Sequence, residues 1–461
     1  MTYEEALAFW YERINYEVRS AGPGDLKLER MRALLRRLGD PHERVRCVHV
    51  TGTKGKGSTC AMLASVLRAA GYRVGLFTSP HLEHVEERIQ VDSVPISHAE
   101  LAALMSDIAP AVRAMEAEAG LPSPTFFEIC TALGFLHFVR RRCDIAILEV
   151  GLGGRFDSTN VCLPLVSIIT NIGLDHTAQL GNTPEEIAYQ KAGIVKRRVP
   201  VVSGVTQEGA RDVVRRVARE VGAPLWEVGE GAKGNPTPGP SPVRGGEQSR
   251  ETARVPLNAS EGQTSFSPPR TGAGPGVGLP RLGLLGAHQV ANAAVACAAL
   301  DRLREAGMHV PDSAVARGLA SVKWPARVEL VSQRPTIILD TAHNVPSAEA
   351  LVRALRECCP VEGAKRVVFA VSSDKQFAEM LRILAGYFDH FQLTKYGNNP
   401  RCVPPEKLAA TLAEVAPGKP FTTYATSAEA WSAAHAAAGV SDLVCITGSV
   451  FLAGELRPFV S

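Results

Sequence analysis

The sequence predicts an α/β protein of two domains, each built around its own sheet. The chain has 461 residues, more than one ordinary hydrophobic core holds, because domains usually contain about 100 to 200 residues. Short apolar runs rich in β-branched residues alternate with helical patterns along most of the chain. The alternation breaks at W-P-A-R, residues 324–327, and then begins again. We therefore expect one domain at residues 1–324 and a second at residues 325–461.

The first domain is expected to contain a parallel sheet, because its strand patterns are separated by helical patterns. Its predicted strands are residues 45–50, 74–77, 144–150, 166–170 and 199–203. The second domain repeats the alternation on a smaller scale, which predicts a smaller, Rossmann-like α/β sheet. Its predicted strands are residues 328–331, 336–340, 366–371, 391–394 and 443–447. Two such domains are expected to enclose a cleft.

Residues 230–282 depart from this pattern. They concentrate Pro, Gly and Ser in stretches such as G-N-P-T-P-G-P-S-P and show no hydrophobic periodicity. We predict a disordered loop here. The helical run A-H-Q-V-A-N-A-A-V-A-C-A-A-L that follows still fits the first domain, so the insert interrupts that domain.

Composition favours a small-molecule partner. The 50 Lys and Arg residues nearly balance the 47 Asp and Glu residues, and no basic run is interleaved with stacking aromatics, so we expect no nucleic-acid partner. The ten cysteines lack metal-binding spacing and predict reduced, mostly buried thiols. The first residues carry acids within an amphipathic pattern, and no stretch is long and apolar enough to span a membrane. A cytoplasmic location without membrane attachment is therefore expected.

The strongest local motif is T-G-T-K-G-K-G-S-T, residues 51–59, between a predicted strand and an apolar helix. We call residues 51–59 the P-loop, because a glycine-rich loop in this position lets backbone N–H groups approach phosphate, and the helix N-terminus favours anions. Lys56 would then meet the β- and γ-phosphates of a nucleotide. The spacing departs from the strict pattern, because Val50 replaces the first glycine and Gly57 separates Lys56 from Ser58. A glycine-rich turn without a ligand is the alternative, which three glycines and two lysines make less favourable.

Two further side chains follow predicted strands of the same sheet. Glu149 ends one strand, and His176 follows the next in T-N-I-G-L-D-H-T. Ligand sites in open α/β sheets lie beyond the carboxyl ends of the strands, so both are candidate Mg²⁺ ligands near the P-loop. Mg²⁺ prefers oxygen, which makes Glu149 an ordinary ligand and His176 an unusual one. A core or helix-capping role for His176 is nearly as plausible.

The ordered motifs of the chain resemble the folylpolyglutamate synthase/dihydrofolate synthase family of the Mur ligase superfamily. Up to residue 196 the matching motifs are G-T-K-G-K-G-S, T-S-P-H-L, E-R-I, T-F-F-E, E-V-G-L-G-G-R-F-D-S-T-N, I-G-L-D-H-T and Q-K-A-G-I. After the insert they are G-A-H-Q-V-A-N-A-A-V-A, P-A-R, L-D-T-A-H-N and I-T-G-S. The resemblance implies the Mur ligase architecture, with an N-terminal P-loop ATPase domain and a smaller C-terminal α/β domain.

The resemblance also implies a catalytic site that uses ATP and two Mg²⁺ ions. Metal ligands are implied at Ser79, Glu149, His176 and Lys191. Lys191 matches the lysine that this superfamily converts to a carbamate, which requires a neutral amine; burial or nearby positive charge would provide one, whereas a solvated lysine would stay protonated. From the residues alone, T-S-P-H-L would be a simple turn after a strand. Catalytic roles are implied for Lys56, Lys191 and His343.

ATP contacts are implied on both sides of the insert. In the P-loop they come from Gly52, Thr53, Lys54, Gly55, Lys56, Gly57 and Ser58. In the second half, Asn292 matches an adenine-side contact, Arg327 a phosphate contact at the domain junction, and Asp340 a nucleotide contact. Asp340 at a strand end suits a ribose hydroxyl or a metal, but it could equally cap the helix that follows.

The implied activity is ligation of L-glutamate to dihydropteroate or to a reduced folate by a monomeric enzyme, through an acyl phosphate. Pterin-side candidates are Thr125, Phe126, Phe127, Glu128, Phe156, Asp157 and Ser158. Without the resemblance, F-F-E at a helix start would more often be packing plus an N-terminal acid. Another Mur-type amino-acid ligase, which lacks T-S-P-H-L and T-F-F-E, is the nearest alternative. A P-loop NTPase regulator without ligase activity is the second.

Several positions depart from the family pattern. The usual D-G-A-H-N-P is D-T-A-H-N-V here, so Thr341 replaces a glycine; P-G-R is P-A-R, and Gln190 precedes Lys191 where glutamate is common. Lys54 stands where asparagine is frequent. Its charge could tighten nucleotide binding, or its side chain could point to solvent.

Overall fold

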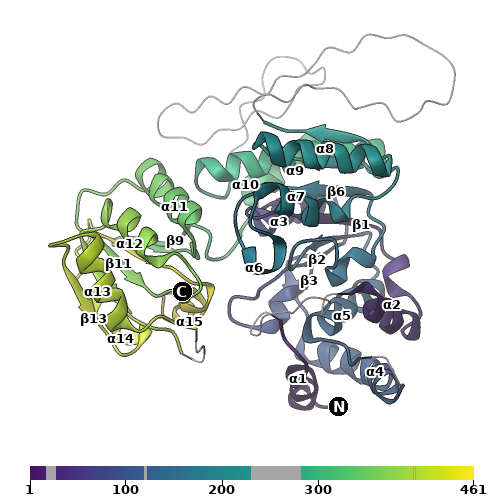
Figure 1. The fold of residues 1–461 in the computed structure, drawn as a ribbon, viewed down its shortest axis with the longest axis horizontal. Helices are drawn as coiled ribbons and strands as arrows, with labels where there is room; N and C mark the ends of the chain where they lie inside the picture. Colours follow the sequence, from purple (N-terminus) through teal and green to yellow (C-terminus); the bar gives the residue numbers. More distant parts are fainter. Residues whose placement is uncertain (17–26, 119–121, 230–281, 398, 400, 461) are drawn as a thin grey trace, which may run out of the picture.

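The computed structural model describes residues 1–16, 27–118, 122–229, 282–397, 399 and 401–460. Its helices and strands form two bodies that lie side by side, each with a sheet between layers of helices (Figure 1). The predicted α/β class is confirmed. We call the body around the first sheet the N-terminal domain and the other the C-terminal domain; the exact boundary at residues 324/325 stays a prediction. The predicted insert lies outside the described residues, apart from Leu282.

The described N-terminal sheet has the strand order β4-β3-β2-β5-β1-β6-β7-β8. Its strands are β1 (Cys47–Thr51), β2 (Val74–Phe77), β3 (Ile89–Val91), β4 (Val94–Pro95), β5 (Ile145–Glu149), β6 (Val166–Ile169), β7 (Val201–Ser203) and β8 (Leu225–Glu227). The strands from β2 to β8 in this order pair in parallel, as predicted, whereas β3 and β4 form an antiparallel extension at one edge. Parallel pairing brings the carboxyl ends of β2, β5, β1 and β6 to one edge of the sheet.

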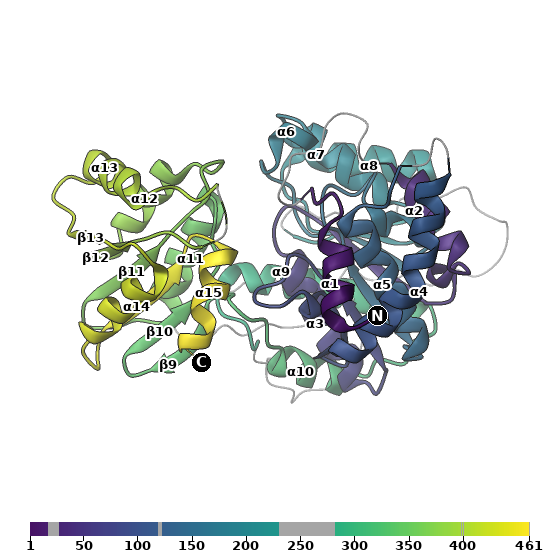
Figure 2. The ribbon, with the colours of Figure 1, turned by 90° about the horizontal axis from the view of Figure 1, so that it is seen from below.

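The N-terminal domain contains these α-helices: α1 (Tyr3–Tyr11), α2 (Leu28–Arg37), α3 (Lys56–Ala69), α4 (His98–Ala117), α5 (Phe126–Arg140), α6 (Thr177–Leu180), α7 (Pro184–Lys191), α8 (Glu208–Val221), α9 (Ala287–Glu305) and α10 (Asp312–Ser321). Short 3₁₀ turns are η1 (Pro41–Glu43), η2 (Val85–Arg88), η3 (Ser158–Val161) and η4 (Ala192–Ile194). Figure 2 shows α1, α4 and α5 together in one layer.

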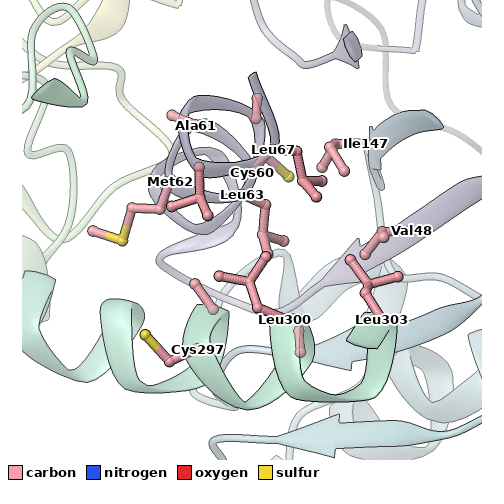
Figure 3. Close-up of a cluster of buried hydrophobic side chains, with 14 of the residues drawn as sticks. Val48, Cys60, Ala61, Met62, Leu63, Leu67, Ile147, Cys297, Leu300 and Leu303 are labelled. Atoms are coloured by element: carbon pink, nitrogen blue, oxygen red, sulfur yellow. The ribbon is translucent and has the colours of Figure 1, made fainter. Parts of the chain in front are cut away.

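Helix α3 is buried on almost every side because it lies between the sheet and two other helices. Leu63 of α3 points toward Leu300 of α9, Leu67 lies beside Ile147 of β5, and Val48 of β1 lies beside Leu303 (Figure 3). Helix α10 approaches so closely that a Cβ on Gly318 would lie 2.4 Å from the Cα of Val66. This packing fixes the direction of α3 and therefore of the P-loop that precedes it.

The described C-terminal sheet has the order β13-β12-β11-β14-β10-β9, parallel except for β9. Its strands are β9 (Glu329–Gln333), β10 (Thr336–Leu339), β11 (Lys365–Phe369), β12 (His390–Leu393), β13 (Phe421–Thr423) and β14 (Leu443–Thr447). Its helices are α11 (Val345–Cys358), α12 (Phe377–Ala385), α13 (Pro405–Val415), α14 (Ser427–Ala436) and α15 (Val450–Val460). One apolar cluster lies under α11, α12 and α13, and another under α14 and α15.

The two domains meet along the carboxyl edge of the N-terminal sheet. Helix α15 lies against the loop that follows β2, where a Cβ on Gly454 would be 2.0 Å from the carbonyl oxygen of Leu82. Beside it, Arg457 Nε lies 3.0 Å from Glu83 Oε1. A separate polar contact joins the P-loop to residue 343, described below. The C-terminal domain therefore touches both loops that carry predicted site residues.

Two general predictions can be compared directly with the structure. All ten cysteines are free thiols, and most are buried, as predicted. Among the described residues, no helix is long and apolar enough to cross a membrane.

Candidate active site

The P-loop connects β1 to α3 at the carboxyl edge of the N-terminal sheet. Gly52 and Gly55 have φ values of 152° and 79°, which side-chain-bearing residues rarely adopt. A Cβ on Gly52 would lie 1.8 Å from Thr170 Oγ1, and one on Gly55 would lie 2.2 Å from Asn292 Oδ1. Glycine is thus required for this loop to pass close to β6 and α9. The same contact places Asn292 of α9, a predicted ATP residue, directly beside the P-loop.

The turn after β6 holds the middle of the P-loop. Thr53 N donates to the carbonyl of Asn171 at 3.0 Å, and Lys54 N donates to Asn171 Oδ1 at 2.8 Å. The Thr53 hydroxyl donates to the carbonyl of Gly173 at 3.0 Å. The I-G-L-D-H motif therefore supports the P-loop as well as carrying His176. Gly57 is placed by a different neighbour, since a Cβ there would lie 3.1 Å from the ring of Trp324.

Two lysines share one acceptor at the start of α3. Lys56 Nζ and Lys191 Nζ each donate to the carbonyl oxygen of Gly52, both at 3.0 Å. Lys191 ends α7 and is only 4% exposed. Burial, reinforced by the charge of Lys56, lowers the pKa of Lys191 well below its ordinary value, and the charge of Asp175 opposes this shift only partly. The site therefore favours a neutral amine at Lys191.

Glu149 ends β5 beside the loop that follows β2. Its carboxylate is 5% exposed and accepts a hydrogen bond from Ser79 N at 3.2 Å. Burial raises the pKa of Glu149, while the charge of Lys56 acts in the opposite direction. Within the described residues no salt bridge reaches this carboxylate. A cation at this position would offset the cost of burying the charge. The structure thus brings Ser79 and Glu149 together.

His176 lies apart from that pair. It precedes α6 with a φ of 50°, makes no side-chain capping bond, and exposes 51% of its side chain. Its ring lies 4.0 Å from Asp175 Oδ1, and no hydrogen bond or ion pair links it to Glu149 or Ser79 among the described residues. In those residues no group of three or more His, Cys, Asp or Glu side chains is arranged to hold a metal. The predicted four-residue metal set is therefore not assembled by protein contacts alone.

On the C-terminal side, Arg327 and Thr341 lie together at the domain junction. Arg327 Nη1 donates to Thr341 Oγ1 at 2.6 Å, so the threonine that replaces the family's glycine supplies an acceptor that glycine lacks. Thr341 is not among the described residues with positive φ, so its backbone does not require glycine. The departure from the family pattern is therefore accommodated without strain.

The carboxylate of Asp340 accepts hydrogen bonds from backbone N–H groups of its own domain. Its carboxylate accepts from Val328 N at 3.0 Å and from Ala342 N at 2.7 Å, and Thr447 Oγ1 lies 3.3 Å away. The helix that follows is capped by Asn344, which accepts from Ser347 N, so the alternative that Asp340 caps α11 is wrong. Asp340 instead fixes the junction segment that carries Arg327. A nucleotide contact for Asp340 stays a prediction.

His343 connects the C-terminal domain to the P-loop. Its Nδ1 lies 2.8 Å from the carbonyl oxygen of Thr341, and its Nε2 lies 3.2 Å from Lys54 Nζ. Burial, with the charge of Lys54, lowers the pKa of His343 to about 3. Lys54 Nζ also donates to Asp175 Oδ2 at 2.8 Å. The alternative that the Lys54 side chain points to solvent is therefore wrong.

The first group of pterin-side candidates forms the start of α5. Thr125 caps the helix by accepting from Glu128 N, and Glu128 accepts in return from Thr125 N at 2.8 Å. Arg30 Nε pairs with Glu128 at 2.6 Å. Phe126 is 1% exposed and stacks on Trp10 with ring centroids 4.8 Å apart. These contacts correspond to the alternative of packing plus an N-terminal acid; substrate contact by these residues stays a prediction.

The remaining candidates lie around the turn after β5. Phe127 packs against Phe77, with centroids 5.9 Å apart, and a Cβ on Gly151 would be 2.5 Å from the Phe127 ring. Asp157 accepts from Leu152 N at 2.9 Å and caps η3. Ser158 Oγ lies 2.5 Å from Thr131 Oγ1 of α5. In contrast, Phe156 is 48% exposed.

Two charged residues at the domain junction were missed by the sequence analysis. Asp175 accepts from Lys54, and Lys375 of the C-terminal domain lies 3.8 Å from Asp175 Oδ1. Asp175 precedes His176 in the quoted D-H motif, which was the available signal. Nothing in the local sequence around Lys375 indicated that it would face residue 175.

Comparison with known proteins gives consistent matches over nearly the whole chain. Residues 50–300 match the Mur ligase middle domain, and residues 326–450 match the Mur ligase glutamate ligase domain. The dihydrofolate synthase/folylpolyglutamate synthase of Bacillus subtilis (strain 168) is 34% identical over 467 residues, covering 99% of this chain and 98% of that protein. The folylpolyglutamate synthase of Lacticaseibacillus casei is 32% identical over 464 residues, covering 99% and 98%.

Solved structures show the same arrangement. The structure of E. coli FolC in complex with DHPP and ADP matches this chain with a TM-score of 0.80 and 30% sequence identity, covering 100% of this chain and 98% of that one. The similarity therefore includes both domains and their order along the chain.

Proposed function

The chain belongs to the folylpolyglutamate synthase/dihydrofolate synthase family and is an ATP-dependent ligase that adds glutamate to folates, and we propose how its own residues carry out that reaction. The observation that carries the proposal is the meeting of the two domains at the P-loop. Lys56, Lys191 and Glu149 lie at the edge of one sheet, and Arg327 and His343 come from the other. A substrate bound there would be enclosed by both domains.

We propose that the P-loop binds the phosphates of ATP. The N-terminus of α3 favours an anion, and Lys56 lies beside it, with its ammonium bonded to the carbonyl oxygen of Gly52. Arg327 approaches from the opposite domain and would add a second cation at the phosphates. Phosphoryl transfer depends mainly on such positioning and charge stabilisation.

We propose that Glu149 and Ser79 hold Mg²⁺ together with phosphate oxygens. The buried, unpaired carboxylate of Glu149 fits an oxygen-preferring cation. Mg²⁺ would neutralise phosphate charge during transfer. The residues of a second site would be His176 and Lys191, the latter as a carbamate, which its lowered amine pKa favours.

The proposed reaction has two stages. A carboxylate of the folate substrate attacks the γ-phosphate of ATP, giving an acyl phosphate and ADP. The amino group of L-glutamate then attacks the acyl carbon, and phosphate leaves as the amide bond forms. Enclosure between the domains would protect the acyl phosphate from water. The acceptor would be dihydropteroate or a reduced folate, contacted from the side of Phe127 and Phe156.

The proposal is tested by incubating the purified protein with Mg-ATP, L-glutamate and either dihydropteroate or a reduced folate. ADP release and product mass are followed together. We expect one glutamate to be added per ADP with at least one acceptor. ADP release without an amide product would instead indicate a nucleotide hydrolase, and no product with either acceptor would contradict the folate assignment.

Lys56→Ala provides the matched test of the phosphate site. Loss of a preorganised charge at a transferring phosphate typically lowers the rate by about 10²–10³-fold. The variant should lose that much ligation activity while keeping the wild-type circular dichroism spectrum. Normal ATP-dependent ligation by Lys56→Ala would remove the P-loop assignment. Monomeric state, cytoplasmic location and the absence of a nucleic-acid partner stay predictions.

A further inference from the structure

Asp175 lies between the two domains and interacts with cations or amides from both. Its side chain is only 11% exposed. From the N-terminal domain, Lys54 Nζ donates to Asp175 Oδ2 at 2.8 Å. From the C-terminal domain, Asn344 Nδ2 lies 3.4 Å from Oδ2 and Lys375 Nζ lies 3.8 Å from Oδ1. One largely buried carboxylate therefore interacts with groups from both sides of the junction.

The hydrogen bonds of His343 give this contact a defined direction. The carbonyl of Thr341 can only accept, so His343 Nδ1, 2.8 Å away, carries the proton. Nε2 is then an acceptor, and its lone pair faces Lys54 Nζ at 3.2 Å. Lys54 thus donates to a carboxylate in its own domain and to an imidazole in the other. Its ammonium has three protons, and two of them are directed at these partners.

We propose that Lys54 is a positioning residue that ties the P-loop to the C-terminal domain through Asp175 and His343. In this role it sets the fraction of molecules closed over the nucleotide site instead of holding phosphate itself. Lys56 is available for phosphate, because among the described residues its side chain is bonded only to the carbonyl oxygen of Gly52. The Lys54 ammonium already directs two of its three protons at Asp175 and His343, one partner in each domain. An asparagine, frequent at this position in the family, is too short to reach across in the same way.

Closure at the P-loop is expected to depend on this contact because the other contacts across the described junction do not involve the P-loop. The other contacts across the described junction are Arg457 with Glu83, Gly454 against Leu82, and Leu285 and Gly286 against α11, where a Cβ on Gly286 would lie 3.0 Å from Ala354 Cβ. Opening the domains would separate Lys54 from His343 and Lys375 from Asp175 together. Removing either lysine should therefore shift the same equilibrium.

The experiment measures the radius of gyration of the full, ligand-free chain by small-angle X-ray scattering. Lys54→Met and Lys375→Met should both increase it. Lys54→Arg should stay close to wild type, because a guanidinium can still pair with Asp175. The control is Lys395→Met, the same change at an exposed lysine of the C-terminal domain. Lys375 lies outside the P-loop, so its variant tests the proposal even if Lys54→Met folds poorly.

Nucleotide affinity gives the second measurement, and here the inference rests on the proposed function. If Lys54 acts through closure, Lys54→Met and Lys375→Met should each weaken nucleotide binding by about 5- to 30-fold. For each variant, the loss should be the same for ADP as for a non-hydrolysable ATP analogue. An unchanged radius together with a larger loss for the ATP analogue would show that Lys54 contacts the γ-phosphate, and would overturn the proposal. Scattering requires no ligase activity, so failure of the proposed function would leave that measurement intact.

Discussion

Single charged residues at this site share acceptors to an unusual degree. Lys56 and Lys191 both donate to Gly52, and Lys54 and Lys375 both face Asp175. Crowding of cations in one place favours anion binding there. The site therefore concentrates positive charge where a polyanionic substrate would bind. At buried Lys191, the lowered pKa favours the neutral amine over the ammonium.

The first prediction concerns Lys191. We expect protein equilibrated with ¹³C-bicarbonate to show a carbamate carbon signal by NMR, and Lys191→Ala to lose it along with about 10²-fold in kcat. Because burial lowers the pKa of Lys191, its amine is available near neutral pH, where a solvated lysine is protonated, so the signal should already be present at pH 7. Lys196→Ala is the control, since Lys196 is bonded to the carbonyl of Asn160. A Lys191→Ala variant with wild-type kcat and an unchanged spectrum would contradict the assignment.

A second prediction concerns pH and stability at His137, far from the metal candidates. His137 lies in α5, 3% exposed, and burial lowers its pKa to about 4. Between about pH 4 and the ordinary value of 6.5 the unfolded chain binds more protons, so stability rises with pH in that window. His137→Gln should lose this dependence, which is worth at most about 3 kcal/mol.

Urea unfolding at pH 7 and pH 4.5 measures the effect. The wild type should lose more free energy of unfolding on acidification than His137→Gln does. Exposed His309→Gln serves as the control and should keep the wild-type pH profile. Equal losses in wild type and His137→Gln would show that burial of this imidazole does not control the pH dependence.

At the level of elements, helix ends and strand ends place the site. Strands β1, β2, β5 and β6 deliver the P-loop, Ser79, Glu149 and the turn with Asn171 to one edge, and α15 closes over the second of these loops. Elements from distant parts of the chain therefore fix one another's positions. Packing at α15 should accordingly affect the chemistry as well as the fold.

The third prediction compares two helical glycines. Alanine normally stabilises a helix by about 1 kcal/mol relative to glycine. Gly454→Ala should instead destabilise by about 1–3 kcal/mol, because the new Cβ would lie 2.0 Å from the backbone carbonyl of Leu82. It should also reduce ligation, since Leu82 follows the Ser79 loop. Thermal unfolding and ligation rate are measured together.

Gly209→Ala in α8 is the matched control. Its Cβ would lie 2.1 Å from Glu185 Oε1, the end of a flexible side chain that can move away. We expect a neutral or stabilising effect and full activity. If Gly454→Ala behaved in the same way as Gly209→Ala, the α15 contact would not constrain the loop.

How far these elements could be predicted from sequence depended on their length and periodicity. Longer apolar strands such as β5 and β14 were located to within a residue or two. Strands β3, β4, β8 and β13 were missed, because each has only two or three residues and offers no pattern. Glu149 could be placed from its position at a strand end. The contact of Lys54 with His343 could not, because no local pattern links residues so far apart in sequence.

The whole molecule behaves as two packed units joined by a polar junction. Among the described residues, no residue belongs to apolar clusters of both domains, although Leu82 and Leu285 of the N-terminal domain, both partly buried, pack against the C-terminal clusters. Such an arrangement permits relative movement of the domains. It also gives each domain its own source of stability.

The fourth prediction follows at this scale. Differential scanning calorimetry of the ligand-free protein should show two transitions, one for each core. ADP with Mg²⁺ at about 100 times its Kd should add about 2.7 kcal/mol to the stability of the states that bind it. The lower transition should then move toward the upper. A single transition whose calorimetric and van't Hoff enthalpies agree would show that the two cores unfold together.

The position of α15 has a consequence for the synthesis of this protein. Leu82 and its loop leave the ribosome long before Gly454, which contacts them in the finished fold. At about 5–20 residues per second, this delay is roughly 20 to 70 seconds. During that time the nascent N-terminal domain can build its own core around α3, but the loop with Ser79 lacks its covering helix. Ligase activity should therefore arise only after α15 has left the ribosome.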